Sequence, residues 1–328
     1  MLEDGALFSS THSTNLIANN FGPADAGGYQ LIVSNSFGMA TSAVAQVTVH
    51  VVDAAGSTPA TPFSSWATAA TNIQDAIDTA VAGDFILVTN GLYATGGRAM
   101  AGTLTNRVAL TKSVVVASVN GPSATIIQGA WDPATTNGPL AVRCAWLTNG
   151  ATLNGFTLRN GATQPYTGLV GSPLVSGGGV WCSSTNGIVS NCVLTNNAAS
   201  FGGGISFGTL NNSLVVLNLA NYGGGAYYAT LNNCTVILNC TTTLSPYHGA
   251  GTYDGITRNS IVLYNYDYYP YGFTEDDYFA SGGAKYYYCC TSINTLIVGT
   301  GNFSASPLFL DLFHIPSNSP CNGSGSPL

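Results

Sequence analysis

The sequence predicts an all-β protein whose main part is a right-handed parallel β-helix, a solenoid in which each turn of the chain adds short strands beside those of the previous turn. Three observations lead to this prediction: few charged residues, abundant glycine, and a seven-residue segment that recurs five times. Repeats with a period of roughly 20 to 50 residues are typical of solenoids, because each repeat can bury its apolar face only against its neighbours.

The composition separates this chain from helical, disordered and nucleic-acid-binding proteins. Only 6% of its 328 residues are charged, 45% are hydrophobic, and 40 are glycine. Amphipathic helices need Lys and Glu on their outer faces, and disordered segments combine low hydrophobicity with high charge. The net charge of −7 leaves no basic surface for a phosphate backbone. No run of about 20 apolar residues is present, so we expect no membrane span.

The recurring segment has Asn at its first and seventh positions and a small residue at its second. The five copies begin 37, 21, 21 and 26 residues apart, with glycine-rich runs between the later ones. The copies are Asn154–Asn160, Asn191–Asn197, Asn212–Asn218, Asn233–Asn239 and Asn259–Asn265. A turn of about 21 residues holds two or three short strands, and corresponding positions stack at about 4.8 Å.

Stacking predicts two asparagine ladders along the solenoid. Asn tolerates left-handed backbone angles at corners, and its amide can bond to the same amide in the next turn. The first ladder is expected to contain Asn191, Asn212, Asn233 and Asn259, and the second Asn197, Asn218, Asn239 and Asn265. Cys192 and Cys234 fall two turns apart, too far for a disulfide. The sequence does not pair the other six of the eight cysteines.

A short helix is expected to cover the N-terminal end of the solenoid. Residues Ala67–Ala82 carry apolar side chains at helical spacing, Gly83 ends the run, and Phe85–Val88 follows as a buried strand. Such a cap is needed because the first turn would otherwise expose its apolar cross-section.

This helix and strand resemble the N-terminal cap of pectin-lyase-like β-helices, and the repeats resemble those of bacterial surface proteins related to polymorphic outer-membrane proteins. The ending, Ser306-Pro-Leu-Phe309 with Ser319-Pro-Cys321, is similar to the closing segment of large exported proteins, here residues 299–328. In those relatives Ile-Asp-Ala-Gly follows the Cys, whereas this chain continues with Asn322-Gly-Ser-Gly. The resemblance covers residues 67–328 and implies a fold and an exported protein rather than an activity.

Residues 1–52 resemble the C-terminal part, strands E to G, of an immunoglobulin-like domain. Tyr29 stands at the tyrosine-corner position, and Leu31 replaces the usual Cys. The expected strands are Thr14–Ala18, Gly28–Ser34 and Ala43–Val52. Three strands leave an open edge and an uncovered apolar face. We therefore expect a longer parent protein or another subunit to supply the rest of the sandwich, and residues 53–66 to form a linker.

The charged residues do not form the arrangement that a polysaccharide lyase or a glycosidase needs. A lyase of this fold needs carboxylates on adjacent coils for Ca²⁺ and an Arg or Lys as base, but only Asp254 occupies an aligned position, and Arg159 and Arg258 fall in different columns. The acidic cluster consists of Glu275, Asp276 and Asp277. A solvated loop tip is the preferred interpretation, and a weak calcium site is the alternative. No catalytic residue or other cofactor is assigned.

Residues 266–288 form a tyrosine-rich excursion from the coil. Tyrosine combines stacking area with a hydroxyl group, which suits sugar binding or protein interfaces. The alternative is a loop that folds over the coil and satisfies its own hydroxyls. Candidate contact residues are Tyr266, Tyr268, Tyr269, Tyr271 and Tyr278 in the excursion, and Trp181, Tyr227 and Tyr253 in a column on aligned coils. In isolation, that column would be ordinary stacking.

Together these features favour a non-enzymatic extracellular protein, a structural or adhesive surface module that assembles head-to-tail into filaments through its incomplete sandwich. The alternative is a lyase or glycoside hydrolase acting on a polysaccharide laid along the helix. Expected partners are further copies, other surface proteins or polysaccharide. Met1 to Asp4 are acidic where a secretion signal would be basic, so we expect the signal for a cell-surface location to lie outside this sequence.

Overall fold

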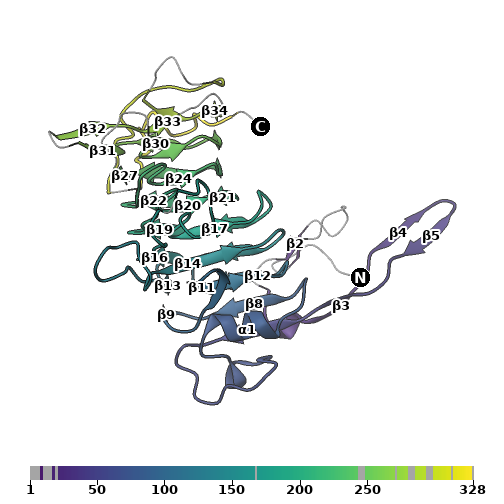
Figure 1. The fold of residues 1–328 in the computed structure, drawn as a ribbon. Helices are drawn as coiled ribbons and strands as arrows, with labels where there is room; N and C mark the ends of the chain where they lie inside the picture. Colours follow the sequence, from purple (N-terminus) through teal and green to yellow (C-terminus); the bar gives the residue numbers. More distant parts are fainter. Residues whose placement is uncertain are drawn as a thin grey trace.

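The computed structural model describes residues 8–9, 17–18, 21–166, 168–242, 248–269, 272–279, 285–292, 298–311 and 313–326. Most of these residues wind into a right-handed parallel β-helix with three long sheets, named A, B and C in the order in which each coil visits them (Figure 1). The described residues include one α-helix, and no helix among them is long and apolar enough to cross a membrane.

The strands of the three sheets follow in spatial order. Sheet A contains β10 (Arg98–Ala101), β11 (Leu104–Leu110), β14 (Val142–Leu147), β17 (Val180–Cys182), β20 (Ile205–Ser206), β24 (Ala226–Tyr227), β28 (Thr252–Tyr253) and β33 (Tyr278–Phe279). Sheet B contains β7 (Val49–Val52), β8 (Phe85–Val88), β12 (Val115–Ser118), β15 (Thr152–Asn154), β18 (Ile188–Ser190), β21 (Thr209–Asn211), β25 (Thr230–Asn232), β29 (Ile256–Arg258) and β34 (Lys285–Tyr287). Sheet C contains β9 (Gly91–Tyr93), β13 (Thr125–Gln128), β16 (Thr157–Arg159), β19 (Val193–Thr195), β22 (Leu214–Val216), β26 (Thr235–Ile237), β30 (Ile261–Leu263) and β35 (Cys290–Thr291).

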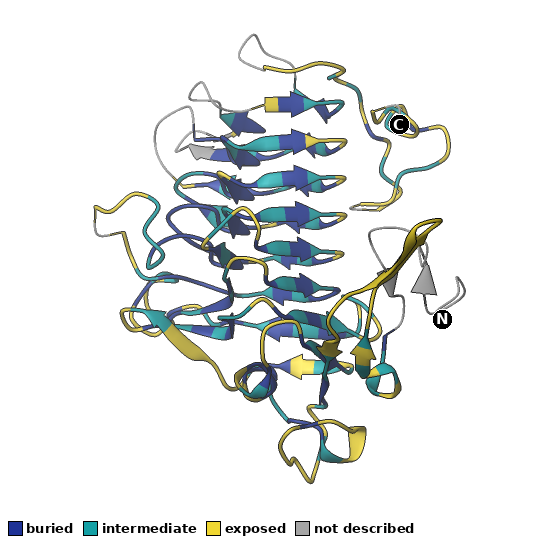
Figure 2. Ribbon diagram, turned by 90° about the vertical axis from the view of Figure 1, so that its right-hand side faces the viewer, coloured by how far each residue is buried: buried dark blue, intermediate teal, exposed yellow. Residues whose placement is uncertain are grey.

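A smaller edge sheet extends the last coils. It contains β23 (Leu219–Ala220), β27 (Cys240–Thr241), β31 (Tyr266–Tyr269) and β32 (Gly272–Glu275), the last pair antiparallel. Inside the solenoid, side chains of the three long sheets meet in one core, in which residues such as Leu194, Leu210 and Val236 are fully buried. Figure 2 shows these buried strands stacked coil upon coil.

The second predicted asparagine ladder forms a hydrogen-bonded column between sheets C and A. The side-chain Nδ2 of Asn197 donates to Oδ1 of Asn218 (3.0 Å), Asn218 to Asn239 (2.9 Å), and Asn239 to Asn265 (2.9 Å). All four side chains are at most 1% exposed. Asn265 donates in turn to Oδ1 of Asp277 (3.1 Å), so a carboxylate ends the ladder.

The first predicted ladder is a backbone column rather than a side-chain ladder. Asn191, Asn212, Asn233 and Asn259 have φ angles of 52°, 48°, 54° and 49°, so each turns the chain from sheet B to sheet C in the left-handed conformation. This turn directs their side chains into solvent, where all four are exposed. The stacking passes instead through the backbone, for example from the N–H of Asn212 to the carbonyl of Asn232 (3.0 Å).

Glycines let adjacent corners of sheet A approach closely. A Cβ atom on Gly204 would lie 2.5 Å from the carbonyl oxygen of Gly225, and one on Gly225 equally near that of Gly251. These contacts explain why the glycine-rich runs recur with the period of the coil.

Helix α1 (Ile73–Thr79) covers the first coil, as the apolar spacing predicts, but it is shorter than residues 67–82. Its start is set by Asn72, whose side chain accepts a hydrogen bond from the N–H of Asp75 (3.0 Å). Preceding residues Trp66–Thr68 form a 3-10 turn instead. The buried Ile73 and Ile77 join the main core, so the helix closes the N-terminal end of the solenoid.

The N-terminal boundary differs from the predicted one. Strand β7 (Val49–Val52), expected to end the immunoglobulin-like part, pairs in parallel with β8 as the first strand of sheet B. Its consecutive buried residues suit a strand that is covered on both faces. Residues 27–47 form an arm that projects from the solenoid (Figures 1 and 2). The arm contains β3 (Gly27–Tyr29) paired with β6 (Ala45–Val47), and β4 (Ile32–Asn35) paired with β5 (Gly38–Thr41).

One feature of the predicted immunoglobulin-like strands is present in this arm. The hydroxyl of Tyr29 donates to the carbonyl oxygen of Asp25 (2.6 Å), the backward bond of a tyrosine corner. Of the expected strand at residues 14–18, the structure describes β2 (Ile17–Ala18), which pairs with β1 (Phe8–Ser9). Among the described residues these paired strands do not build two packed sheets.

Candidate functional site

An aromatic stripe runs along the outer face of sheet A. Side chains of each strand alternate, so Val180 and Cys182 point into the main core while Trp181 lies on the outer side. The register places Trp146 opposite Trp181, and Tyr253 opposite both Tyr227 and Phe279. The stripe consists of Trp146, Trp181, Phe207, Tyr227, Tyr253 and Phe279.

The rings of the stripe are in continuous contact. Ring centroids are 4.1 Å apart for Trp146 and Trp181, 5.1 Å for Tyr227 and Tyr253, and 5.0 Å for Tyr253 and Phe279. Ser206 leaves a gap in the column, and Phe207 fills it with edge contacts to Trp181 (6.4 Å) and Tyr227 (6.1 Å). From β14 to β33 the stripe is roughly 24 Å long at the spacing of parallel strands.

The sequence predicts three members of this stripe, Trp181, Tyr227 and Tyr253, and misses the others. Phe207 escapes because it lies one position beyond the aligned column, where a φ of 61° turns its side chain back over the strand. Tyr228 and Asp254 occupy the same left-handed position on the next two coils, with φ of 50° and 53°. Tyr228 is 43% exposed and adds a further ring beside the stripe.

A long excursion between β16 and β17 packs along one side of the stripe. Its Val175 forms a buried cluster with Phe201 and Tyr227, separate from the main core. Tyr222 stacks on Phe201 with ring centroids 5.3 Å apart, and Tyr166 meets the same ring edge-on. The excursion therefore makes a wall beside the aromatic rings.

Arg143 of β14 holds this wall in place by hydrogen bonds to its backbone. Its guanidinium donates to the carbonyl oxygens of Gly177 (2.8 Å), Ser176 (2.8 Å) and Pro173, and to Oδ1 of Asn106 (2.6 Å). The side chain is 1% exposed, and no described carboxylate forms an ion pair with it. Burial lowers the pKa of Arg143 to about 9, so the group keeps its charge at neutral pH. Its Cζ lies 5.8 Å from the ring of Trp146.

The hydroxyls of the stripe stay protonated. Burial, followed by the nearby Tyr228, raises the pKa of both Tyr227 and Tyr253 above the ordinary value. Tyr253, which is half-buried, can therefore stack on a ligand and donate a hydrogen bond without adding negative charge, whereas the predicted contact residue Tyr227 is 5% exposed and packs beneath the surface. The indole nitrogen of Trp181 is shielded from solvent and has no hydrogen-bond partner among the described residues.

Beside the stripe, two carboxyl groups share a hydrogen bond. Asp267 in β31 is 5% exposed and bonds through its side chain to Asp276. Asp276 also accepts from the backbone N–H groups of His248, Gly249 and Ala250. Burial, then repulsion by Asp276, raises the pKa of Asp267 to about 8, and burial raises the pKa of Asp276. Because the backbone donors favour an ionised Asp276, Asp267 holds the shared proton.

This pair flanks the aromatic surface, since the ring of His248 lies 4.6 Å from that of Tyr222, which contacts Tyr253 at 5.6 Å. The sequence did not single out Asp267. The available signal was its position two residues after Asn265, which corresponds to Ala220 and Thr241 on the two preceding coils, both of them buried.

The predicted acidic cluster is divided among different partners. Glu275 is exposed, Asp276 bonds to Asp267, and Asp277 ends the asparagine ladder. No group of three His, Cys, Asp or Glu side chains in the described part of the chain could hold a metal ion. The calcium site predicted at Glu275, Asp276 and Asp277 stays a prediction, because these three carboxylates do not converge on one point in the structure.

The tyrosines of the excursion have different locations. Tyr278 points into the main core beside Tyr286, with ring centroids 5.2 Å apart, because it occupies an inward position of β33. It is therefore a core residue and no contact residue. Tyr266 is half-buried in β31. Tyr268 and Tyr269 belong to the same strand, but their side chains lie outside the described part, as does Tyr271 altogether.

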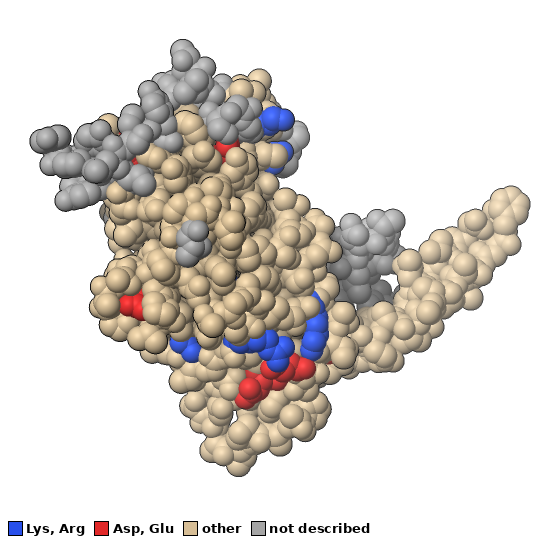
Figure 3. All heavy atoms as spheres, in the orientation of Figure 1, with Lys and Arg blue, Asp and Glu red and all other residues tan. Residues whose placement is uncertain are grey.

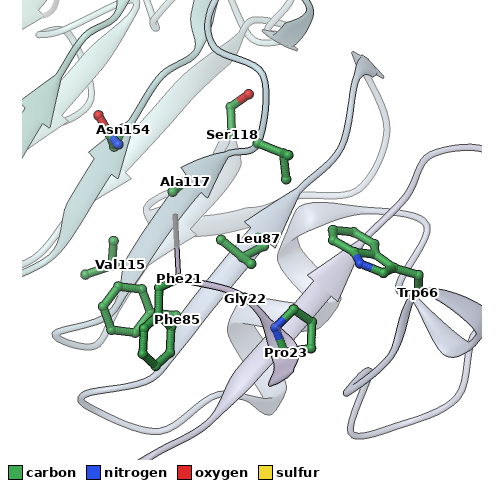
Figure 4. A pocket seen from close by; sticks show the side chains of 11 residues that line it. Phe21, Gly22, Pro23, Trp66, Phe85, Leu87, Val115, Ala117, Ser118 and Asn154 are labelled. Carbon is green, nitrogen blue, oxygen red and sulfur yellow. The ribbon is translucent and has the colours of Figure 1, made fainter. Parts of the chain in front are cut away.

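A groove of ≈ 520 Å³ lies between the N-terminal segment and the outer face of sheet B (Figure 4). Phe21 and Phe85 meet there with ring centroids 5.1 Å apart, and Leu87 and Val115 continue the apolar lining. Ser118 and Asn154 are polar members of the lining, which holds no carboxylate or cation. The groove offers apolar contact but no catalytic group.

Because Asp267 is protonated in the folded protein, the free energy of unfolding is expected to depend on pH. Its pKa is raised on folding, so the folded protein binds more protons than the unfolded chain between about pH 4 and pH 8. The free energy of unfolding should therefore fall as the pH rises through that window. Asp277, whose pKa burial raises to about 6, acts in the same direction.

Asp267→Asn should reduce this pH dependence and raise the melting temperature at pH 8, measured by thermal unfolding across the window. Glu275→Gln, which changes an exposed carboxylate, is the matched control and should change the profile far less than Asp267→Asn, because Glu275 is the smallest of the contributions to the pKa of Asp277. Equal pH profiles for wild type and Asp267→Asn would show that the pair is ionised in the folded state.

The three stacked parallel sheets define this protein as a right-handed parallel β-helix, and the aromatic stripe lies on the outer face of one of them. No protein-family model and no curated protein matches the chain. Similar solved structures include the pectate lyase Pel9A, at 13% identity over 81% of this chain and 83% of that chain (TM-score 0.44). A pectin methylesterase from carrot is 11% identical over 79% and 78% (TM-score 0.41). Pectin methylesterase PemA from Erwinia chrysanthemi is 13% identical over 77% and 80% (TM-score 0.40).

Proposed function

We propose that this protein is an extracellular β-helix that binds a polysaccharide along the aromatic stripe of sheet A. The observation that carries the proposal is the continuous column of rings from Trp146 to Phe279, parallel to the solenoid axis, in which every ring is half-exposed except Tyr227, which is 5% exposed. Faces of sugar rings stack on aromatic side chains, and a column at strand spacing presents one platform after another to an extended chain. Tyrosine hydroxyls beside the rings supply hydrogen bonds to sugar hydroxyls.

The charge of the surface favours a neutral glycan over an acidic one. Arg143, the cation nearest to the Trp146 ring, is buried and holds four acceptors of the protein itself. In the face shown in Figure 3, Lys and Arg lie near the first coils, where Arg98 pairs with Asp78 (2.8 Å), and in a small group by the last coils, while most of the described surface between them carries no charge. Binding should therefore depend little on salt.

Removing a ring from the stripe should weaken binding. Tyr253→Ala is expected to lower the affinity for a soluble neutral glycan about tenfold, or roughly 1.4 kcal/mol, because Tyr253 contacts rings on both neighbouring coils. Trp181→Ala should have a similar effect. Isothermal titration calorimetry with mixed-linkage β-glucan, galactomannan and polygalacturonate measures both the affinity and the preference for neutral chains.

Tyr287→Ala is the matched control, because Tyr287 is a half-buried aromatic residue on sheet B that lies beside Arg258 rather than in the stripe. It should leave glycan affinity unchanged. Equal losses in Tyr253→Ala and Tyr287→Ala, or preferential binding of polygalacturonate that disappears with salt, would contradict binding of a neutral chain to sheet A.

A polysaccharide-active enzyme is the second candidate, favoured by the carboxyl groups beside the stripe. Asp254 directly follows Tyr253, and Asp267 holds a proton at neutral pH, the form that a general acid needs. Glycoside hydrolysis pairs such an acid with a second carboxylate. New reducing ends released from a bound glycan, and lost in Asp267→Asn while binding persists, would support the enzyme. Intact glycans after long incubation would support binding alone.

Assembly with further copies or other surface proteins is part of the same proposal. The arm exposes apolar side chains, with Leu31, Phe37 and Met39 exposed by 52%, 96% and 71%. Exposed apolar surface of this kind marks a contact region. Its resemblance to strands of an immunoglobulin-like domain, with the Tyr29 bond to Asp25, supports strand addition by a partner and a bacterial surface location. A monodisperse monomer in light scattering at high concentration would contradict self-assembly.

A further inference from the structure

The C-terminal closing segment is hydrogen-bonded to the last coils along residues 298–305, and beyond them its large apolar side chains are mostly exposed. After β35 the chain returns beside the solenoid, where Val298 bridges to Lys285 and Phe303 bridges to Cys290. Its far end is held by the N–H of Ser326, which donates to Oδ1 of Asn259 (2.9 Å). Large apolar side chains of the segment stay in solvent, including Leu310, which is 73% exposed. Segments with so little buried apolar surface open easily.

Two cysteines meet where this segment contacts the coil. Cys290 in β35 is 2% exposed, and Cys321 of the closing segment is half-buried. Both residues line the same narrow space beside Asn259, and the Cys321 thiol is near enough to contribute to the raised pKa of Cys290. The position of Cys321 is fixed by its N–H bond to Oγ of Ser319 (3.1 Å), whose hydroxyl in turn bonds to the carbonyl of Pro307 (2.7 Å).

The other cysteines are placed differently. Cys144, Cys182, Cys192, Cys234 and Cys289 are fully buried small residues of the solenoid core. Cys234 and Cys289 belong to one column, but Ser260 lies between them and its hydroxyl accepts the N–H of Cys234 (2.9 Å). Cys240 lies in the edge sheet, where its thiol bonds to the carbonyl of Thr241 (3.3 Å). Among the eight cysteines, all within the described residues, Cys290 and Cys321 are the two that line one space between the coil and the closing segment.

We propose that Cys290 and Cys321 form a disulfide bond that fastens the closing segment to the last coil of the β-helix. A disulfide oxidant, such as oxidised glutathione, supplies the chemistry. The half-exposed thiolate of Cys321 attacks one glutathione sulfur, which forms a mixed disulfide and releases a first glutathione thiolate. The thiolate of Cys290 then displaces the second glutathione. The two cysteines lose two electrons and two protons in total, and glutathione disulfide is reduced to two thiols.

The order of these steps follows from exposure. Burial raises the pKa of the Cys290 thiol to about 12, and its sulfur donates to the carbonyl of Ala305 (3.2 Å). Cys290 is therefore a poor first nucleophile, whereas Cys321 is accessible from solvent. Once the mixed disulfide has formed, the contact between the two side chains places Cys290 for the second step.

The bond would stabilise the C-terminal end of the solenoid. Among the described residues, no helix covers that end as α1 covers the first coil. It closes a loop that includes residues 291 to 320, so reduction restores the freedom of that whole segment to the unfolded ensemble. While the bond is intact, opening of the closing segment cannot carry Cys321 away from β35. The expected consequence is local, because coils of a solenoid contact only their neighbours.

The test compares the native protein incubated with oxidised and with reduced glutathione. After oxidation, alkylation in denaturant should label six of the eight cysteines, and peptide mass spectrometry should find the peptide containing Cys290 linked to that containing Cys321. Limited proteolysis of the closing segment should slow about tenfold on oxidation. Cys321→Ser should abolish both effects, and Cys240→Ser, which changes another half-buried cysteine, should preserve them.

Eight labelled cysteines after oxidation, or a linkage between any other two, would overturn the proposal. Equal proteolysis rates in the two redox states would show that the bond does not fasten the segment. The redox comparison uses the unaltered chain, so the result does not depend on whether a variant folds. It is also independent of glycan binding, because sheet A takes no part in the readout.

Discussion

Replacing Asn239 by alanine is expected to lower the free energy of unfolding by about 3–5 kcal/mol. The Asn239 side chain is fully buried and holds two neighbouring coils together. Its Oδ1 accepts from the backbone N–H of Asn218 (3.0 Å) and from its Nδ2 (2.9 Å). Its own Nδ2 donates to the carbonyl of Val215 (3.0 Å) and to Oδ1 of Asn265 (2.9 Å). Alanine would leave these groups buried without partners.

Asn233→Gly is the matched control for this substitution. Asn233 begins the same seven-residue segment, but its side chain is exposed and its φ of 54° is one that glycine adopts freely. Its stability should change by less than about 1 kcal/mol. Urea unfolding followed by circular dichroism measures both variants. A loss below about 1 kcal/mol in Asn239→Ala would mean that water replaces the amide in the ladder.

The contrast between these two asparagines shows what the repeat predicts. A period of 21 residues predicts that identical positions stack, and the structure stacks them in sheets B and C with no shift of register. Whether an Asn stacks through its amide or its backbone depends on its φ angle. The sequence spacing does not contain that angle, because each of the last four repeats places one Asn at the left-handed turn and another at the buried corner.

Insertions explain most of the remaining differences. Between Asn265 and Asp277 the chain makes the β31–β32 hairpin, so the residue that ends the ladder is a carboxylate outside the aligned segments. The same hairpin brings Asp267 against Asp276. The repeat period does not predict which side chains meet after an insertion of this kind. The sequence therefore predicts a solvated loop tip for Glu275, Asp276 and Asp277, two of which the structure holds in hydrogen bonds.

The candidate surface was predicted in part for a related reason. Trp181, Tyr227 and Tyr253 recur at equivalent positions, so alignment finds them, whereas Trp146 precedes the regular repeats and Phe207 lies beside the column. The wall along the stripe depends on the excursion before β17, which has no counterpart on other coils. Its position is fixed by one buried side chain rather than by periodicity.

That side chain is Arg143, and Arg143→Met is expected to destabilise the protein by about 3–5 kcal/mol. Methionine fills much of the volume but donates no hydrogen bond. The carbonyl oxygens of Gly177, Ser176 and Pro173 would lose a charged donor in a place that water reaches poorly. The free energy of unfolding of Arg143→Lys should lie between those of the wild type and Arg143→Met, because one ammonium group cannot replace all the hydrogen bonds of a planar guanidinium.

The loss should be concentrated in the wall beside the stripe. Hydrogen–deuterium exchange at residues 172–178 should become faster in Arg143→Met, while exchange in the asparagine ladder between β26 and β30 should stay slow, since distant coils of a solenoid are only weakly coupled.

Arg159→Met is the matched control. Arg159 is a half-buried arginine of β16 whose Nε donates to the side chain of Gln128 (2.9 Å), and its loss should cost at most about 1 kcal/mol. If Arg143→Met and Arg159→Met show equal stability and equal exchange, the excursion is held by its apolar contacts with Phe201 alone, and the buried arginine has no structural role in the wall.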